Sequence, residues 1–199
     1  LLAAMARAGA AEERLELPEL LALVIDLSLA GNDNTSNLVG NAFLALVAHP
    51  DQQGLLREHP ELVPGAIEET LRYDSPQQAA VRIVSREARL GGERLHPGQV
   101  VITMLGAANR DPEAFPDPDQ FKVTREPTHR HLAFGLGPHF CIGAPIARMA
   151  GEAAVRALLQ RFEVLRLAGG APLVAVPRSA DWMTRSGRVI AVDTTALAD

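Results

Sequence analysis

One glycine-rich segment constrains the fold of this chain more than any other: residues 134–143 read FGLGPHFCIG and carry the chain's single cysteine, Cys141. Glycine permits tight turns and a close backbone approach to a flat ligand. The segment runs directly into Ala144-Pro145, at the start of a helix that we predict over residues 145–162. Amide N–H groups and the dipole at a helix start favour negative charge, so we expect Cys141 to be a thiolate. The alternative is a small buried cysteine in a glycine-rich turn, which is the commoner situation for a lone cysteine.

Cysteine count and composition exclude several classes of protein. One cysteine permits no disulfide within the chain and no multi-cysteine zinc site. The formal net charge is −5 and no long basic run is present, which argues against nucleic acid as a partner. The most apolar run, residues 20–30, is too short to cross a bilayer and is interrupted by Asp26 and Ser28. Since the sequence also shows no signal peptide, we expect a cytoplasmic protein without a membrane partner.

Helical and extended patterns succeed one another along the chain. Helices are predicted over residues 18–48, 51–57, 64–73 and 145–162, and short antiparallel strands over 81–85, 88–90 and 99–104, with two or three more in the tail at 173–192. Residues 109–133 are rich in proline and irregular. The first half of the helix at 18–48 is apolar almost all round, which predicts burial in a large core. This order of elements predicts an α-rich α+β fold.

Three motifs together indicate a family. The cysteine loop fits F-G-x-G-x-H-x-C-x-G, the long helix carries Ala30-Gly31-Asn32-Asp33-Asn34-Thr35, and Glu69-Thr70-Leu71-Arg72 fits E-x-x-R. In this order they resemble the cytochrome P450 family, in particular its soluble bacterial members. The resemblance implies the C-terminal, haem-binding portion of that fold, in which a long helix crosses the distal face of the haem. Small antiparallel sheets and the cysteine loop followed by a helix complete the expected fold.

The resemblance also implies a cofactor and its ligands. The cofactor would be haem b (iron protoporphyrin IX), with Cys141 as the axial ligand of the iron, and such a thiolate favours cleavage of the O–O bond. The other residues expected at the haem are Phe134, Gly135 and Gly143 near its proximal face, and His139 and Arg82 at its propionates. The planar fork of an arginine suits a carboxylate. A solvated arginine on a strand is the alternative for Arg82.

On the long helix the sequence departs from the family pattern A/G-G-x-D/E-T. Asn34 stands at the threonine position and Thr35 follows one residue later. Neighbouring helical residues point about 100° apart, so Thr35 should not simply replace the missing hydroxyl. We interpret Asp33, Asn34 and Thr35 as the catalytic group, in which Asn34 positions a proton-delivering water and Asp33 gates its supply. The equally weighted alternative is that Asn34, Thr35 and Ser36 are ordinary polar residues at a helix kink.

Glu69 and Arg72, three residues apart, share one face of their predicted helix. In isolation such a pair is common at surfaces and weak. In the family it is structural and holds a proline-rich segment, here residues 115–121, below the haem. The family commonly carries an arginine where Gln120 stands, and because a buried pair without its third member would be costly, Arg125 is our candidate for that member.

The resemblance implies a monooxygenase of the cytochrome P450 type, which inserts one oxygen atom of O₂ into a small organic substrate. Its electrons would come from a partner of the ferredoxin and ferredoxin reductase type, docked near His129, Arg130 and Arg148, although a solvated surface explains these cations equally well. The expected substrate pocket comprises Leu27, Ala30 and Gly31 on the long helix, Gln78 and Ala79 within residues 77–81, and the turn at 180–183. Plain core packing is the alternative for the apolar members.

Two other functions stay open. A peroxygenase that uses H₂O₂ would bypass the proton-delivery step, so the Asn34 departure favours this alternative. Against it, the long helix has no arginine to hold a substrate carboxylate. The other is a truncated, non-catalytic haem-binding fragment. Family members are about twice as long as these 199 residues, and the chain begins with Leu1. We therefore expect residues 1–199 to be the C-terminal part of one domain whose N-terminal half is absent, and expect the chain alone to be incompetent as an enzyme.

Overall fold

The computed structural model describes residues 16–126, 131–162, 165 and 190–192. Within these ranges the helices are α2 (Leu17–Ala48), α3 (Pro50–Glu58), α4 (Val63–Tyr73), α5 (Leu105–Ala108) and α6 (Ala144–Arg161), with 3-10 turns η1 (Pro60–Leu62) and η2 (Gly137–His139). The four predicted helices are confirmed, each within one residue at either end. The short α5 is not predicted, because four residues are too few to show a helical period.

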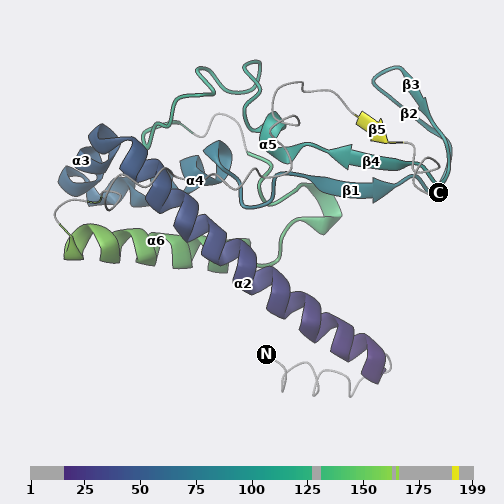
Figure 1. Ribbon diagram of the computed structural model, residues 1–199, viewed down its shortest axis with the longest axis horizontal. Helices are drawn as coiled ribbons and strands as arrows, with labels where there is room; N and C mark the ends of the chain where they lie inside the picture. Colours follow the sequence, from purple (N-terminus) through teal and green to yellow (C-terminus); the bar gives the residue numbers. More distant parts are fainter. Residues whose placement is uncertain (1–15, 127–130, 163–164, 166–189, 193–199) are drawn as a thin grey trace, which may run out of the picture.

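The long helix α2 begins at a reciprocal cap and ends at a proline. The Glu16 amide donates to the Glu19 carboxylate at 2.8 Å, and the Glu16 side chain caps the helix in return. His49 precedes Pro50 and leaves the α region, which ends the helix. Figure 1 shows α2 running diagonally, with its C-terminal half packed on α4 and α6 and its N-terminal half extending away from them.

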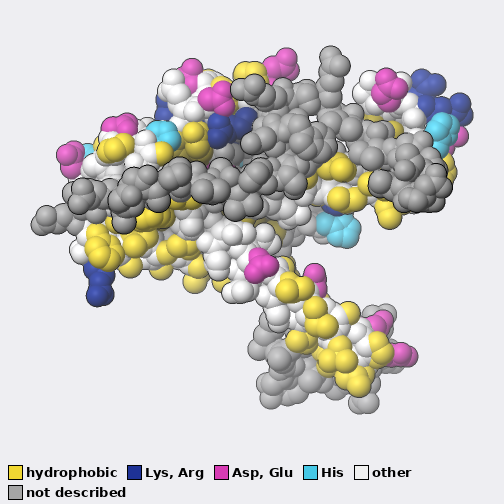
Figure 2. Space-filling view, in the orientation of Figure 1, with side chains coloured by type: hydrophobic (Ala, Val, Ile, Leu, Met, Phe, Trp, Pro, Cys, Tyr) yellow, Lys and Arg dark blue, Asp and Glu magenta, His cyan; other side chains and the backbone are white. Residues whose placement is uncertain are grey.

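The projecting half of α2 is an exposed apolar surface. Leu17, Leu21, Ile25 and Leu29 follow one another at intervals of four residues, and each is more than half exposed. Figure 2 shows hydrophobic side chains gathered along this half. The burial predicted for it is therefore wrong within the described part of the chain, because no described element covers this stripe. The same part of the chain contains no helix that is long and apolar enough to cross a membrane.

The buried core lies where α2 crosses α4 and α6. Leu38 of α2 and Ile67 of α4 are almost completely buried and meet beside Gly151 of α6. A Cβ on Gly151 would lie 3.1 Å from Ile67 Cδ1 and 3.4 Å from Leu38 Cδ2, so this glycine permits a close approach of the three helices. The start of α6, which Cys141 precedes by three residues, is thereby placed relative to the middle of α2.

Two small antiparallel sheets complete the fold. β1 (Ala80–Ile83), β4 (Val100–Thr103) and β5 (Ile190–Val192) lie in the order β1-β4-β5, with Ala80 opposite Thr103. β2 (Ala88–Leu90) and β3 (Glu93–Leu95) form a hairpin at one end of the molecule, visible in Figure 1. Gly91 and Gly92 take φ of 58° and 89° in its turn. An α-rich α+β architecture is therefore confirmed.

The predicted strands are confirmed in place but not in every boundary. The strands predicted at 81–85 and 99–104 are shorter, and β3 is not predicted because it follows the glycine turn without an apolar run. Within the predicted tail strands, only residues 190–192 lie in the described part, where they form β5. The described residues of the segment 109–133 form no helix or strand, as predicted.

Candidate functional site

The cysteine loop reaches α6 through two left-handed glycines. Gly135 and Gly137 have φ of 73° and 79°, a region that other residues rarely adopt. The Gly135 amide donates to the Leu132 carbonyl at 2.9 Å, and the Cys141 amide donates to the Phe134 carbonyl at 3.0 Å. The glycines therefore allow the loop to fold back until Cys141 meets Phe134.

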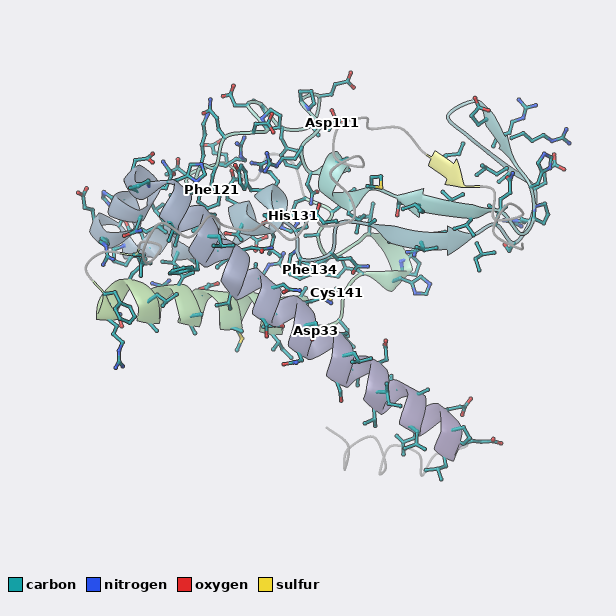
Figure 3. The ribbon with its side chains drawn as sticks, in the orientation of Figure 1. Asp33, Asp111, Phe121, His131, Phe134 and Cys141 are labelled. Atoms are coloured by element: carbon teal, nitrogen blue, oxygen red, sulfur yellow. The ribbon has the colours of Figure 1, made fainter. Side chains whose placement is uncertain are left out.

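Cys141 presents its thiol on an apolar surface at the start of α6. The side chain is exposed, which argues against a small buried core cysteine. Its neighbours Leu136, Phe140 and Ile142 are 77%, 50% and 88% exposed. A Cβ on Gly143 would lie 3.8 Å from the Cys141 sulfur, so this glycine borders the thiol. In the view of Figure 3, Cys141 lies beside the stretch of α2 that carries Asp33.

The predicted catalytic group lies on an unbroken stretch of α2. Residues 17–48 form one continuous helix, so the kink of the alternative interpretation is not seen. Asn34 is exposed, and its Nδ2 donates to the Ala30 carbonyl one turn earlier at 3.3 Å. Asp33 is exposed too, whereas Thr35 is half-buried. The threonine side chain therefore points in a different direction from that of Asn34, as expected for neighbours on a helix. The catalytic roles of the three residues stay predictions.

The predicted pocket residues on α2 lie on its accessible side. Ala30 and Gly31 are exposed and Leu27 is half-buried. No described atom lies within 4 Å of a Cβ built on Gly31. This part of α2 therefore offers a smooth surface with little side-chain bulk.

The pocket residues predicted before β1 behave differently from each other. Gln78 turns back onto the end of α4, where its Nε2 donates to the Ser75 carbonyl at 2.7 Å and to Asp74 Oδ1 at 3.3 Å. Ala79 is half-buried and makes no such contact. The amide of Gln78 thus has a structural role, and its place in a pocket stays a prediction. The turn predicted at 180–183 lies outside the described residues.

The two side chains expected at the haem propionates are exposed. Arg82 lies on β1, with Nη1 donating to the Val81 carbonyl at 2.8 Å, and His139 ends η2. Within the described ranges neither forms an ion pair with a carboxylate of the chain. Both are accessible to an external carboxylate, as the predicted role requires.

A buried ion cluster joins α4 to the proline-rich segment. Arg72 donates to both oxygens of Glu69 at 2.8 Å, and each side chain is 2% exposed, which rules out a surface pair. Arg125 Nε lies 3.0 and 3.1 Å from the same two oxygens, so the predicted third member is confirmed. Arg72 also donates to the carbonyls of Asn109, Pro118 and Gln120 at 2.9, 2.8 and 3.1 Å. The backbone of Gln120, rather than its side chain, takes part.

Sequence reasoning missed the buried Asn109. Its Oδ1 accepts from the Leu132 amide at 2.7 Å, and its Nδ2 donates to the Ser75 hydroxyl at 2.8 Å. Asn109 therefore ties the start of the cysteine loop to the end of α4. An asparagine within an irregular segment carries no periodic pattern that could have identified it.

Sequence reasoning also missed Glu68 and His131. Glu68 accepts from Arg148 Nε at 2.6 Å and Nη2 at 3.0 Å, and its Oε2 lies 3.1 Å from His131 Nε2. Arg148 is thus bound to Glu68 and lies over the Phe134 ring, 4.6 Å from its centroid. Arg148 is therefore ion-paired within the chain, and its part in a docking face stays a prediction. His129 and Arg130, its predicted companions, lie outside the described residues.

The carboxyl of Glu68 has a strongly altered pKa. Burial raises the pKa of Glu68, but hydrogen bonds from His131 and Arg148, with the charge of Arg148, outweigh burial and lower it from 4.5 to about 2. A carboxyl whose pKa is lower in the folded than in the unfolded chain stabilises the fold above its ordinary pKa. The contribution of Glu68 is therefore complete at neutral pH and is lost as the pH falls from about 4.5 towards 2.

The residues of this site fit a haem. A protein that holds haem offers an axial ligand for the iron, such as a cysteine sulfur, an apolar surface for the ring and partners for the two propionates. The exposed Cys141 sulfur, the apolar side chains around it and the accessible Arg82 and His139 meet these three needs. Elsewhere in the described part, no three His, Cys, Asp or Glu side chains converge as a metal site.

Comparisons with known proteins agree with this geometry. Residues 1–186 match the family model described as Cytochrome P450. The chain is 48% identical over 169 residues to Cytochrome P450 107B1 of Saccharopolyspora erythraea, which covers 84% of this chain and 42% of that protein. It is 44% identical over 154 residues to 6-deoxyerythronolide B hydroxylase of the same organism, covering 77% and 38%.

Solved structures of cytochrome P450 proteins also match this chain. The structure of the ligand-free P450 monooxygenase TamI matches with a TM-score of 0.78 and 41% identity, covering 84% of this chain and 41% of that one. The chain therefore spans about two fifths of the length of the relatives that it matches.

Proposed function

The chain belongs to the cytochrome P450 family, and from that premise we propose that it forms the thiolate loop and the distal helix of a haem-thiolate monooxygenase. The observation that carries this proposal is the exposed Cys141 thiol on an apolar surface, in a loop closed by the hydrogen bond from the Cys141 amide to the Phe134 carbonyl. The order of the motifs supports placing these residues in the C-terminal part of a single domain.

The proposed reaction inserts one atom of O₂ into a small organic substrate. The second oxygen atom leaves as water, and two electrons and two protons are consumed. Bound haem b would supply the oxygen activation. Cys141, in the loop that precedes α6, would be the sulfur ligand of the iron.

The remaining site residues would orient the haem and the substrate. Arg82 and His139 would bind the propionates through charge-assisted hydrogen bonds. Leu27, Ala30 and Gly31 would form the helical wall of the substrate pocket, with Ala79 and Gln78 near β1. A relative is named 6-deoxyerythronolide B hydroxylase, which supports hydroxylation or a related oxidation as the reaction class.

The electron source separates the possible functions. We propose that a ferredoxin and its reductase supply the electrons. The test assays the haem-loaded chain alone and joined to the N-terminal part of Cytochrome P450 107B1. Each is supplied either with NAD(P)H, O₂ and ferredoxin partners or with H₂O₂. We expect product from the joined protein with the redox partners.

The other outcomes identify the alternatives. Equal product from H₂O₂ alone would identify a peroxygenase, whose weight comes from Asn34 at the threonine position. Thiolate-ligated haem without product under either condition would identify a non-catalytic haem-binding chain. Turnover by the chain alone would contradict its expected incompetence.

Replacing Asn34 with alanine is expected to lower the yield of product per electron pair several-fold while haem binding is unchanged. Asn34 Nδ2 already contacts the Ala30 carbonyl, and Oδ1 has no partner in the described part of the chain, so the amide can hold a water. The measurement is product formed per NAD(P)H oxidised in the joined protein. The control is Asn37→Ala, an exposed asparagine three residues later on α2. Equal yields from both variants would disprove the role of Asn34.

A further inference from the structure

Two adjacent glutamates of α4 belong to different clusters. Neighbouring helical residues point about 100° apart, so Glu68 and Glu69 face different elements. Glu69 is buried against Arg72 and Arg125 of the ion cluster. Glu68, whose side chain is 41% exposed, contacts His131 at the start of the cysteine loop and Arg148 of α6. Glu68 therefore bridges the two elements that flank Cys141.

The Glu68 bridge to α6 has the geometry of a strong ion pair. The carboxylate takes both Nε and Nη2 of Arg148, at 2.6 and 3.0 Å. Two parallel bonds to one guanidinium fix its plane as well as its position. That plane lies over the Phe134 ring, with the guanidinium carbon 4.6 Å from the ring centroid. Glu68 thus decides where Arg148 sits on Phe134.

The bridge to the loop fixes the ring of His131. The Ala133 amide donates to Nδ1 of His131 at 3.3 Å, which leaves Nε2 to donate to Glu68 at 3.1 Å. The ring then packs against Phe134, with centroids 6.0 Å apart. Phe134 is therefore held between two side chains that Glu68 binds.

Phe134 connects the side chains of His131 and Arg148 to Cys141. Its carbonyl accepts the Cys141 amide at 3.0 Å, the contact that closes the loop. Glu68, His131, Phe134 and Arg148 line one pocket together with Phe140, the residue before Cys141. Figure 3 labels His131, Phe134 and Cys141, which follow one another along the chain towards α6.

Arg148 also interacts electrostatically with the cysteine. The hydrogen bond to Glu68 raises the pKa of Arg148, and the negative charge of Cys141 raises it further. Arg148 is thus paired with Glu68 and interacts with the residue that is the proposed iron ligand. Without Glu68, the whole positive charge of Arg148 would act on the sulfur.

We propose that Glu68 is a positioning residue for Cys141: it holds His131 and Arg148 against Phe134, whose carbonyl accepts the Cys141 amide, and it neutralises the charge of Arg148. This inference rests on the proposed haem-thiolate function. An uncompensated cation near the haem stabilises the reduced state, which carries one positive charge fewer. Loss of the Glu68 charge therefore raises the reduction potential of the iron, and loss of the Arg148 charge lowers it.

The test measures the reduction potential and the ferrous–CO spectrum of haem-loaded protein. We expect a higher potential in Glu68→Gln, a lower one in Arg148→Gln, and a value near that of the parent protein in the double variant. Glu68→Asp keeps the charge and should shift the potential less than Glu68→Gln. The matched control is Glu61→Gln, an exposed glutamate of η1, which should leave the potential unchanged.

Opposite shifts separate this role from a merely structural one, because general damage to the site would move both single variants in the same direction. Shifts of the same sign, or an unchanged potential in Glu68→Gln, would overturn the proposal. If Glu68→Gln does not fold, the test is the potential of Arg148→Gln, which should lie below those of the parent protein, Glu68→Asp and Glu61→Gln; a potential at or above theirs would overturn the proposal. A parent protein without thiolate-ligated haem would instead overturn the proposed function, and this inference with it.

Discussion

Replacing Arg72 with methionine is expected to lower the free energy of unfolding by about 3–5 kcal/mol. The substitution leaves the Glu69 carboxylate buried with one of its two guanidinium partners removed. It also removes the donors to three carbonyls, of which two belong to the proline-rich segment at Pro118 and Gln120. Unsatisfied buried groups add to the cost. The proline-rich segment would therefore lose part of its attachment to α4 and keep the part that runs through Arg125.

The measurement for Arg72→Met is a urea titration followed by circular dichroism. The matched control is Arg94→Met on the β2–β3 hairpin, where Arg94 pairs with Glu87 in solvent. Such exposed pairs contribute little, so we expect a change within about 0.5 kcal/mol. Equal stabilities of the two variants would show that burial of the Glu69 cluster does not stabilise the fold.

Replacing Cys141 with serine is expected to abolish substrate oxidation while leaving the fold intact. The side chain is exposed and makes no core contact, so the free energy of unfolding should change by less than about 1 kcal/mol. A serine hydroxyl stays protonated at neutral pH and donates far less electron density than a thiolate, so it cannot serve as the same axial ligand. The loss should therefore be specific to the chemistry.

Product formation and the urea midpoint of Cys141→Ser are measured on the same preparation of the joined protein, beside the joined parent protein. We expect no detectable product and an unchanged midpoint. Retained turnover would exclude Cys141 as the iron ligand. A collapsed midpoint would show that the cysteine has a structural role that its exposure does not indicate.

The sequence predicts the helices well because each carries local boundary markers. Pro18, Pro50 and Pro145 mark helix starts within one residue of their observed places. Arg125 could be predicted as the third member of the Glu69 cluster because the family resemblance places the pair in the interior, where the cost of a buried charge demands a partner. Local pattern was sufficient for the helices, whereas the cluster also required the resemblance.

Other features could not be predicted because they depend on contacts between distant residues. Glu68 meets His131 and Arg148 across 63 and 80 positions of the chain, and nothing near Glu68 indicates either partner. The same holds for Asn109, which binds the loop at Leu132. The prediction of burial for the first half of α2 is wrong for another reason. An apolar pattern predicts burial, but it does not say which element covers the surface.

The central claim, that Cys141 is the axial ligand of a haem, is tested most directly by the CO-difference spectrum of the dithionite-reduced, haem-loaded protein beside Cys141→Ser. We predict the red-shifted Soret band of thiolate-ligated haem in the parent protein and its loss in the variant. A band of that kind that persists in Cys141→Ser, or its absence from parent protein that has bound haem, would contradict the claim.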